Sequence, residues 1–218
     1  MKQNLAKLFS FIFHPILLPS LATILLFSMP SYLNNFQYIY KRGVTQIVLL
    51  STFITPMLII LILINTKIIS SFYLSEKKER FYPFSIVSFI YIFTYLILKN
   101  LNLGLLSVPS YINNFILISA ITIFAILIIN FKIKASAHMA GFGAFLSFFY
   151  IFFLKENIGN VLFTTFGFNI TIIHFFSIII LVGGIIASSR LILKAHTMKE
   201  ITIGFFVGIC VGLFSIFF

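Results

Sequence analysis

The stretch INNFILISAITIFAILIINF, Ile112–Phe131, decides the class of this protein. It contains no charged side chain over its whole length. About 20 consecutive apolar residues are what an α-helix needs to cross the hydrocarbon core of a bilayer. A helix pairs all of its own backbone groups, which lipid requires, so this stretch predicts a transmembrane helix.

Further apolar runs of similar length lie on both sides of that stretch. Together they predict an all-α integral membrane protein, a bundle of about seven transmembrane helices. No linker or low-complexity tract separates the runs, so we expect a single transmembrane domain over residues 1–218. The predicted spans are Leu8–Met29, Val44–Ile64, Phe84–Leu98, Ile112–Phe131, Ala137–Leu154, Ile170–Ser188 and Ile201–Phe218.

The first run resembles a signal peptide in having Lys2 and Lys7 in front of it. It lacks a small-residue cleavage site, and Pro15 and Pro19 interrupt it early. We therefore expect it to remain in the protein as one of the helices.

The charge balance limits the possible partners. The chain has 15 Lys and Arg against 4 acidic residues, a net charge of +11, and these charges lie in short gaps between apolar runs. Anionic membrane lipids or a phosphorylated substrate match this distribution better than nucleic acid does. The sequence gives no indication of the oligomeric state.

Metal chemistry is not expected. The chain has no Asp, and its acids are Glu76, Glu79, Glu156 and Glu200, whereas Mg²⁺ held against a diphosphate needs clusters of carboxylates. The single cysteine, Cys210, excludes an intramolecular disulfide and a multi-cysteine metal site. We expect neither a metal nor a cofactor.

Polar segments collect on one membrane face. Seven crossings place the N-terminus and the gaps 65–83, 132–136 and 189–200 on the same side, which we call the charged end. Ionisable groups at membrane depth are costly and indicate function. The gaps, with the helix starts beside them, contain SEKKERFYP (Ser75–Pro83), KIKASAH (Lys132–His138) and SSRLILKAHTMKE (Ser188–Glu200).

The side chains at the charged end suit an anionic ligand. Arg80 and Arg190 can each offer a bidentate fork to phosphate oxygens, Lys77 a point charge, and Ser136 a hydroxyl donor. These residue types predict a phosphate-binding site.

Two histidines at the charged end can divide the acid and nucleophile roles of phosphoryl transfer, namely His138 and His196. Glu200 follows His196 by four residues, one helical turn, where it can fix the tautomer of the imidazole. Thr197 to Glu200 also fits a capping box that starts a helix, and the two roles are compatible because a carboxylate has two oxygens.

Other conspicuous residues are expected to be structural. His14 and His174 lie within apolar runs and are expected to pack or to form hydrogen bonds inside the protein. Small residues allow helices to approach closely. We assign that role to Gly141, Gly143, Gly183 and Gly184.

The charged end carries a family resemblance. One motif begins at Ser189-Arg190 and continues, after five residues, with His196 and, after three more, with Glu200. It resembles the third signature of the type 2 phosphatidic acid phosphatase superfamily, S-R-x5-H-x3-D. Ser136-Ala137-His138 is similar to its second signature, P-S-G-H. Lys77 to Pro83 is similar to a degraded first signature, K-x6-R-P. The three motifs occur in the family's order, and the resemblance covers about residues 75–218.

This resemblance implies a metal-independent lipid phosphatase in which six helices form the core. His196 would be the nucleophile that becomes a phosphohistidine, Glu200 would orient it, and His138 would protonate the leaving alcohol. The residues implied to bind phosphate are Arg80, Arg190, Ser136 and Lys77.

The chain departs from the family pattern at several positions. Ala135 and Ala137 replace Pro and Gly, Glu200 replaces Asp, and Tyr73 stands where the first signature has Lys. The choice of Lys77 over Lys78 rests only on helical facing. These departures leave a second possibility, a catalytically weak or inactive relative that binds lipid phosphates.

Two functions from other classes also remain open at this point. A non-catalytic lipid-binding scaffold would keep the basic gaps but would need no pairing of His196 with Glu200. A bis-histidine haem protein would need two histidines facing each other across the core.

The substrate and the orientation are left open. Phosphatidate, phosphatidylglycerophosphate, a polyprenyl phosphate or diphosphate, and a lipid A phosphate all fit. We expect a bacterial cytoplasmic (inner) membrane. The charged end holds 11 of the 15 Lys and Arg, which predicts that it faces the cytoplasm, whereas the resemblance implies the outer leaflet.

Overall fold

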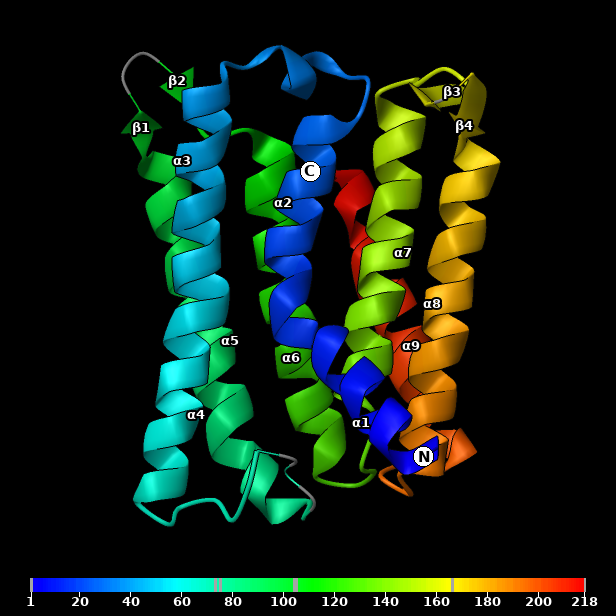
Figure 1. Cartoon of the computed structure of the whole chain (residues 1–218). Helices are drawn as coiled ribbons and strands as arrows, with labels where there is room; N and C mark the ends of the chain where they lie inside the picture. Colours follow the sequence, from blue (N-terminus) through cyan, green and yellow to red (C-terminus); the bar gives the residue numbers. More distant parts are fainter. Residues whose placement is uncertain (1, 73, 75, 104–105, 166, 218) are drawn as a thin grey trace.

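The computed structural model describes residues 2–72, 74, 76–103, 106–165 and 167–217. Met1 and Phe218, the predicted domain limits, lie outside these residues, as do Tyr73 and Ser75 of the first motif region. Long helices run side by side, with the connecting segments gathered at the two ends of the bundle (Figure 1).

Among the described residues, seven helical segments are long and apolar enough to cross a membrane. The prediction of an all-α membrane bundle is confirmed, and the chain is an integral membrane protein. The third and seventh segments are longer than the apolar runs that predicted them. The seven segments are Lys2–Ser28, Tyr38–Asn65, Lys78–Asn100, Ser110–Asn130, Ala137–Lys155, Ile172–Ile192 and Met198–Phe217.

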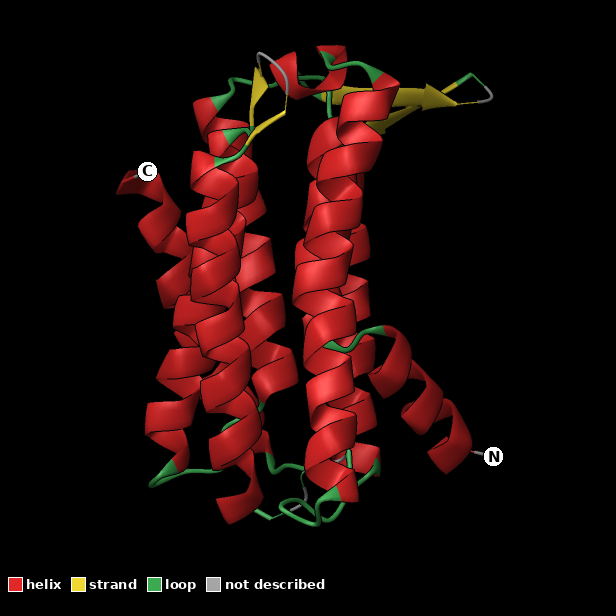
Figure 2. Cartoon of the chain, turned by 90° about the vertical axis from the view of Figure 1, so that its left-hand side faces the viewer, coloured by secondary structure: helices red, strands yellow, loops and turns green. Residues whose placement is uncertain are grey.

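The first segment, Lys2–Ser28, matches the span predicted over Leu8–Met29, and its helix is broken at Pro15. Proline has no N–H and pushes the residue before it out of the α-helical conformation. His14, which precedes Pro15, is extended, with φ −67° and ψ 134°. Helix α1 leaves the bundle at an angle to the long helices (Figure 2). The pieces are α1 (Lys2–Ile12), η1 (Pro15–Leu17) and α2 (Leu18–Ser28).

The second segment contains a wider turn. A π-helix, η3 (Leu50–Ile54), lies between α3 (Tyr38–Leu49) and α4 (Thr55–Asn65). Buried Tyr91 of α5 (Phe81–Asn100) donates a hydrogen bond of 2.8 Å to the carbonyl oxygen of Thr52. Such turns interrupt the regular helical pattern and are frequent at functional sites.

The remaining long helices are α6 (Ser110–Asn130), α7 (Ala137–Lys155), α8 (Ile172–Ile192) and α9 (Met198–Leu213). Short 3-10 turns precede or extend the neighbouring helices. They are η2 (Tyr32–Asn35), η4 (Lys78–Arg80) and η5 (Phe214–Phe217).

Two short antiparallel hairpins lie at the end opposite the charged end, and the sequence did not predict them (Figure 1). Their strands are β1 (Asn102–Leu103), β2 (Leu106–Ser107), β3 (Val161–Thr165) and β4 (Phe168–Thr171). Gly167, in the turn between β3 and β4, has a φ of 79°, which glycine adopts without a steric cost.

Helices α7 and α9 pack with their backbones in contact. A Cβ added at Gly143 would collide with the carbonyl oxygen of Phe205, and one added at Gly208 with that of Ala140. The expected packing role also holds at Gly141 and Gly183, but it is wrong for Gly184, which has open space where a Cβ would lie. Small residues let the two helices approach, and this contact fixes how their first turns meet.

Candidate functional site

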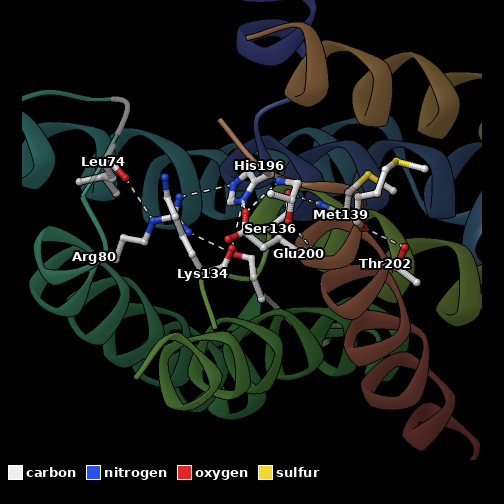
Figure 3. A network of polar contacts seen from close by, with 11 residues as sticks. Leu74, Arg80, Lys134, Ser136, Met139, His196, Glu200 and Thr202 are labelled. Carbon is white, nitrogen blue, oxygen red and sulfur yellow. Dashed lines mark hydrogen bonds and ion pairs between the residues drawn. The ribbon is translucent and has the colours of Figure 1, made fainter. Parts of the chain in front are cut away.

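Segments far apart in the sequence meet at the charged end (Figure 3). Arg80 precedes α5, Lys134 lies in the connection before α7, and Arg190 lies in the last turn of α8. His196 lies between α8 and α9, and Glu200 in the first turn of α9. The structure thus brings together most of the charged residues that the sequence singled out.

The chain reverses direction sharply after α8, and this turn determines where His196 lies. Lys194 has a φ of 51°, in the left-handed region. Its N–H donates to Leu191 at 2.9 Å, and the N–H of Ala195 donates to Arg190 at 3.1 Å. These bonds satisfy the last carbonyl groups of the helix and turn the chain back over it. His196 consequently points into the protein and is only 6% exposed.

The hydrogen bonds of His196 select one neutral tautomer. Nδ1 lies 3.0 Å from the carbonyl oxygen of Lys134 and 3.2 Å from Oε2 of Glu200, and both are acceptors. Nε2 lies 3.4 Å from Nη2 of Arg80, which can only donate. Nδ1 therefore carries the proton, and Nε2 presents its lone pair beside a guanidinium.

The surroundings keep this imidazole uncharged. Burial, followed by the charges of Arg80, Arg190 and Lys134, lowers the pKa of His196 to about 3. Its contact with Glu200 is therefore a hydrogen bond of a neutral ring and not an ion pair. A neutral imidazole with a free Nε2 lone pair is the form that can act as a nucleophile.

Glu200 makes both of the contacts expected for it, one with His196 and one with the start of α9. Its Oε2 accepts hydrogen bonds from Nδ1 of His196 and, at 3.0 Å, from the backbone N–H of Thr197. The Thr197 hydroxyl accepts in turn from the N–H of Glu200, which completes the capping box. One carboxylate oxygen serves both contacts, whereas the sequence suggested that the two oxygens would divide them.

Arg80 is a buried cation that two backbone carbonyl groups hold in place beside His196. It is 4% exposed. Its Nε donates to the carbonyl oxygen of Leu74 and its Nη1 to that of Ala135, each at 3.1 Å. These bonds aim the outer edge of the guanidinium at His196 (Figure 3).

Arg190 is a second buried cation, and it is 5% exposed. Its Nε has no hydrogen-bond partner among the described residues. Burial and the nearby charge of Arg80 lower the pKa of Lys134, the third cation of the cluster. Removing an unpaired charge from water is costly. The cluster is therefore complementary to an anion.

Ser136 connects the starts of α7 and α9. Its hydroxyl accepts the N–H of Met139 at 3.5 Å as the cap of α7, and its own N–H donates to the carbonyl oxygen of Glu200 at 3.1 Å. Its side chain is fully buried and is not among the residues that line the cavity described below. The structure gives Ser136 a positioning role.

Lys77 is held away from the histidines. Its Nζ donates to the carbonyl oxygen of Lys132 at 3.0 Å, and its own carbonyl oxygen accepts from Asn130 at 2.8 Å. It is not one of the described residues that line the cavity. The spacing of the first motif gave no indication of these partners.

His138 lies near the other site residues but is engaged elsewhere. Its Nε2 lies 3.1 Å from the carbonyl oxygen of Ser10 in α1 and donates to it. Its ring meets that of His14 edge to face, with centroids 5.1 Å apart. The sequence did not predict this contact, because it depends on the direction that α1 takes after the break at Pro15.

A cavity of about 410 Å³ leads from these residues into the bundle. Its polar wall contains Arg80, Arg190, His138, His196 and His14. Deeper in the bundle its wall is mostly apolar, with Met57, Ile60, Val87, Tyr91 and Ile123. Such a shape accommodates a molecule with one anionic end and one hydrophobic end.

His196 also lines a second, more open hollow on the polar side of the cluster. The other residues of this hollow include Lys134, Lys194 and Glu200. The imidazole therefore stands between the cavity and the polar exterior. Among the residues that the structure describes, no three His, Cys, Asp or Glu side chains are arranged to hold a metal ion.

Comparison of the chain with protein-family models, with curated proteins and with solved structures finds no significant match. The membership suggested by the motifs therefore stays a prediction that rests on the residues themselves.

Proposed function

We propose that the protein is a metal-independent lipid phosphatase that hydrolyses a lipid phosphate or diphosphate ester through a phosphohistidine on His196. The observation that carries this proposal is the position of Nε2 of His196 beside Arg80. Arg190, whose Nε has no partner among the described residues, lies in the wall of the same cavity. Buried guanidinium groups bind phosphate oxygens, and the cavity matches a lipid chain.

In the first step, the Nε2 lone pair attacks phosphorus and the bond from phosphorus to the lipid oxygen breaks. Phosphorylation makes the imidazole ring cationic while Nδ1 keeps its proton. The carboxylate of Glu200, 3.2 Å from Nδ1, stabilises that charge. The two arginines neutralise the phosphoryl oxygens as charge moves toward the leaving group.

The departing lipid alkoxide takes a proton from His138, which acts in its protonated, imidazolium form and becomes neutral in this step. This requires the His138 ring to release the carbonyl oxygen of Ser10, to which its Nε2–H donates. In the second step, water attacks phosphorus, the bond between phosphorus and Nε2 breaks, and inorganic phosphate leaves. His138 accepts the proton that the water loses. The open hollow beside His196 supplies a path for that water.

A second candidate is a weak or inactive relative that binds lipid phosphates. Two contacts favour it: His138 donates to Ser10, and Lys77 donates to Lys132. In this case the arginines would bind the headgroup without turnover.

The other two classes fit the site less well. A haem protein needs a free nitrogen on each of two facing histidines, whereas Nε2 of His138 donates to Ser10 and both histidines share a wall with two arginines, which suit an anion. A scaffold does not need a buried, unprotonated Nε2 beside a guanidinium. The proposal further includes a bacterial cytoplasmic membrane, membrane lipids as neighbours, and a lipid phosphate as substrate.

The test is phosphate release from a panel of lipid phosphates and diphosphates by the purified chain in detergent. With a substrate labelled at phosphorus, acid-labile and base-stable label should appear on the wild-type chain and be absent from His196→Asn. Turnover without this label would exclude the phosphohistidine. Binding without any turnover would select the second candidate.

A further inference from the structure

His14 lies in the wall of the cavity with the two arginines and two other histidines, although the sequence predicted only packing or hydrogen bonding within the protein. It is half-buried at the break between α1 and η1. Its ring also contacts Phe72, with centroids 5.2 Å apart. Two aromatic neighbours, Phe72 and His138, thus hold the ring at the polar end of the cavity.

The hydrogen bonds of His14 leave one nitrogen free. Nδ1 accepts the backbone N–H of Ile16 at 3.4 Å and so caps η1. The neutral ring therefore carries its proton on Nε2. No residue that the structure describes forms a hydrogen bond with this Nε2–H, whereas the corresponding group of His138 donates to Ser10.

We propose that His14 is a ligand-binding residue whose Nε2–H donates to a phosphate oxygen of the molecule in the cavity. This inference rests on the proposed phosphate site and adds a donor from the N-terminal segment. The ligand would then contact three separate parts of the chain: His14 before η1, Arg80 before α5, and Arg190 in α8.

The alternative is that His14 only caps η1, and two substitutions separate the possibilities. In His14→Asn, the side-chain oxygen can replace Nδ1 and keep the cap, but no group reaches the position of Nε2. In His14→Gln, the amide nitrogen can reach the position of Nε2, but the cap is lost. If His14 binds phosphate, His14→Asn should lose affinity and His14→Gln should keep it. Thermal stability should show the opposite pattern, because only His14→Asn keeps the cap of η1.

His174 provides a matched control. Its Nδ1 caps the start of α8 with Thr171, at the opposite end of the bundle from the cavity. His174→Asn and His174→Gln therefore repeat the same chemistry at a cap that is remote from the site.

Binding would be measured by titration calorimetry on the full chain in a non-ionic detergent, with orthophosphate and with dodecyl phosphate as separate probes. Loss of a hydrogen bond to a charged group should weaken binding of both probes to His14→Asn about tenfold or more. His14→Gln and both His174 variants should bind within about threefold of wild type, since their donor set toward phosphate is intact.

The following outcomes would overturn the inference. Wild-type affinity in His14→Asn would show that Nε2–H makes no contact. Equal losses in His14→Asn and His14→Gln would show that affinity does not follow the Nε2 donor, and a loss confined to His14→Gln would show a cap role alone. Loss for dodecyl phosphate but not orthophosphate would show that His14 packs against the chain of the lipid. Failure of wild type to bind either probe would remove both this inference and the phosphate site. Binding of the probes without turnover would leave His14 as a ligand-binding residue and would exclude only the proposed phosphatase activity.

Discussion

Nε2 of His196 and Nη2 of Arg80 lie 3.4 Å apart, although 116 residues separate them in the sequence. Because the guanidinium can only donate, this contact keeps Nε2 unprotonated and directs its lone pair toward the cations that would hold a phosphate. The first two predictions follow from this pair.

Replacing His196 by Asn should reduce phosphate release by several orders of magnitude. The nucleophile is lost, while the amide can still donate to Lys134 and Glu200 as Nδ1 does. Single-turnover phosphate release and thermal unfolding would be measured together. The position of His196 in a gap between spans predicts that its replacement leaves folding intact. The side chain is buried, however, so His196→Ala should also lower stability, by about 1–3 kcal/mol. Activity within tenfold of wild type in His196→Asn would contradict the nucleophile role.

Stability should depend on pH through the same ring. Folding lowers the pKa of His196 to about 3, from about 6.5 in the unfolded chain, so the unfolded chain binds the extra proton. The stabilisation that comes from keeping the His196 ring neutral is fully present above pH 6.5 and is lost as the pH falls toward 3. At pH 5 the loss should be about 2 kcal/mol. Unfolding of wild type and His196→Asn across this range isolates the effect, and parallel curves would show that the ring is not held neutral.

Hydrolysis should survive EDTA. The chain has only 4 acidic residues, and Arg80 and Arg190 supply positive charge where a metal ion would otherwise be needed. Phosphate release would be compared before and after chelation. A loss of activity that Mg²⁺ restores would exclude the proposed mechanism.

Gly208→Ala should destabilise the protein by about 1–3 kcal/mol, because the added methyl group would push α9 away from the carbonyl oxygen of Ala140. Gly184→Ala is the matched control, since it also changes a glycine within a transmembrane helix but has open space around it. Thermal unfolding in detergent would measure both. Equal effects of the two substitutions would show that the contact between α7 and α9 is not tight.

The charged end should face the cytoplasm, as its 11 Lys and Arg against 4 at the other end indicate. In a Cys210→Ser background, single cysteines would replace Asn34 and, separately, Gln3, which are both exposed. A membrane-impermeant thiol reagent applied to intact cells should label the Asn34→Cys variant and spare the Gln3→Cys variant. The reverse pattern would place the site outside and show that the site's own arginines biased the count.

The sequence was sufficient where one local property decides the structure. Long apolar runs must be helices in lipid, and the spacing of Thr197 and Glu200 suffices for a capping box, so both predictions are confirmed. Three glycines at four-residue intervals, Gly204, Gly208 and Gly212, also carried a packing signal that sequence analysis overlooked.

Features that depend on distant partners could not be predicted in this way. The proline break was visible at Pro15, but not that it would carry Ser10 to His138. Lys77 has the expected residue type and spacing, yet the carbonyl oxygen of Lys132 holds its amine. In both cases the partner is a backbone oxygen whose position depends on the packing of whole helices.

The wide separation of Arg80 and His196 also sets when the site can exist during synthesis. At about 5–20 residues per second, the ribosome adds His196 on the order of ten seconds after Arg80. Five of the seven spans are complete before α8 and α9 are made. A chain that stops before His196 would therefore insert most of its helices and still lack the proposed nucleophile. Under the proposed function, activity would appear only after translation and insertion of the last two helices are complete.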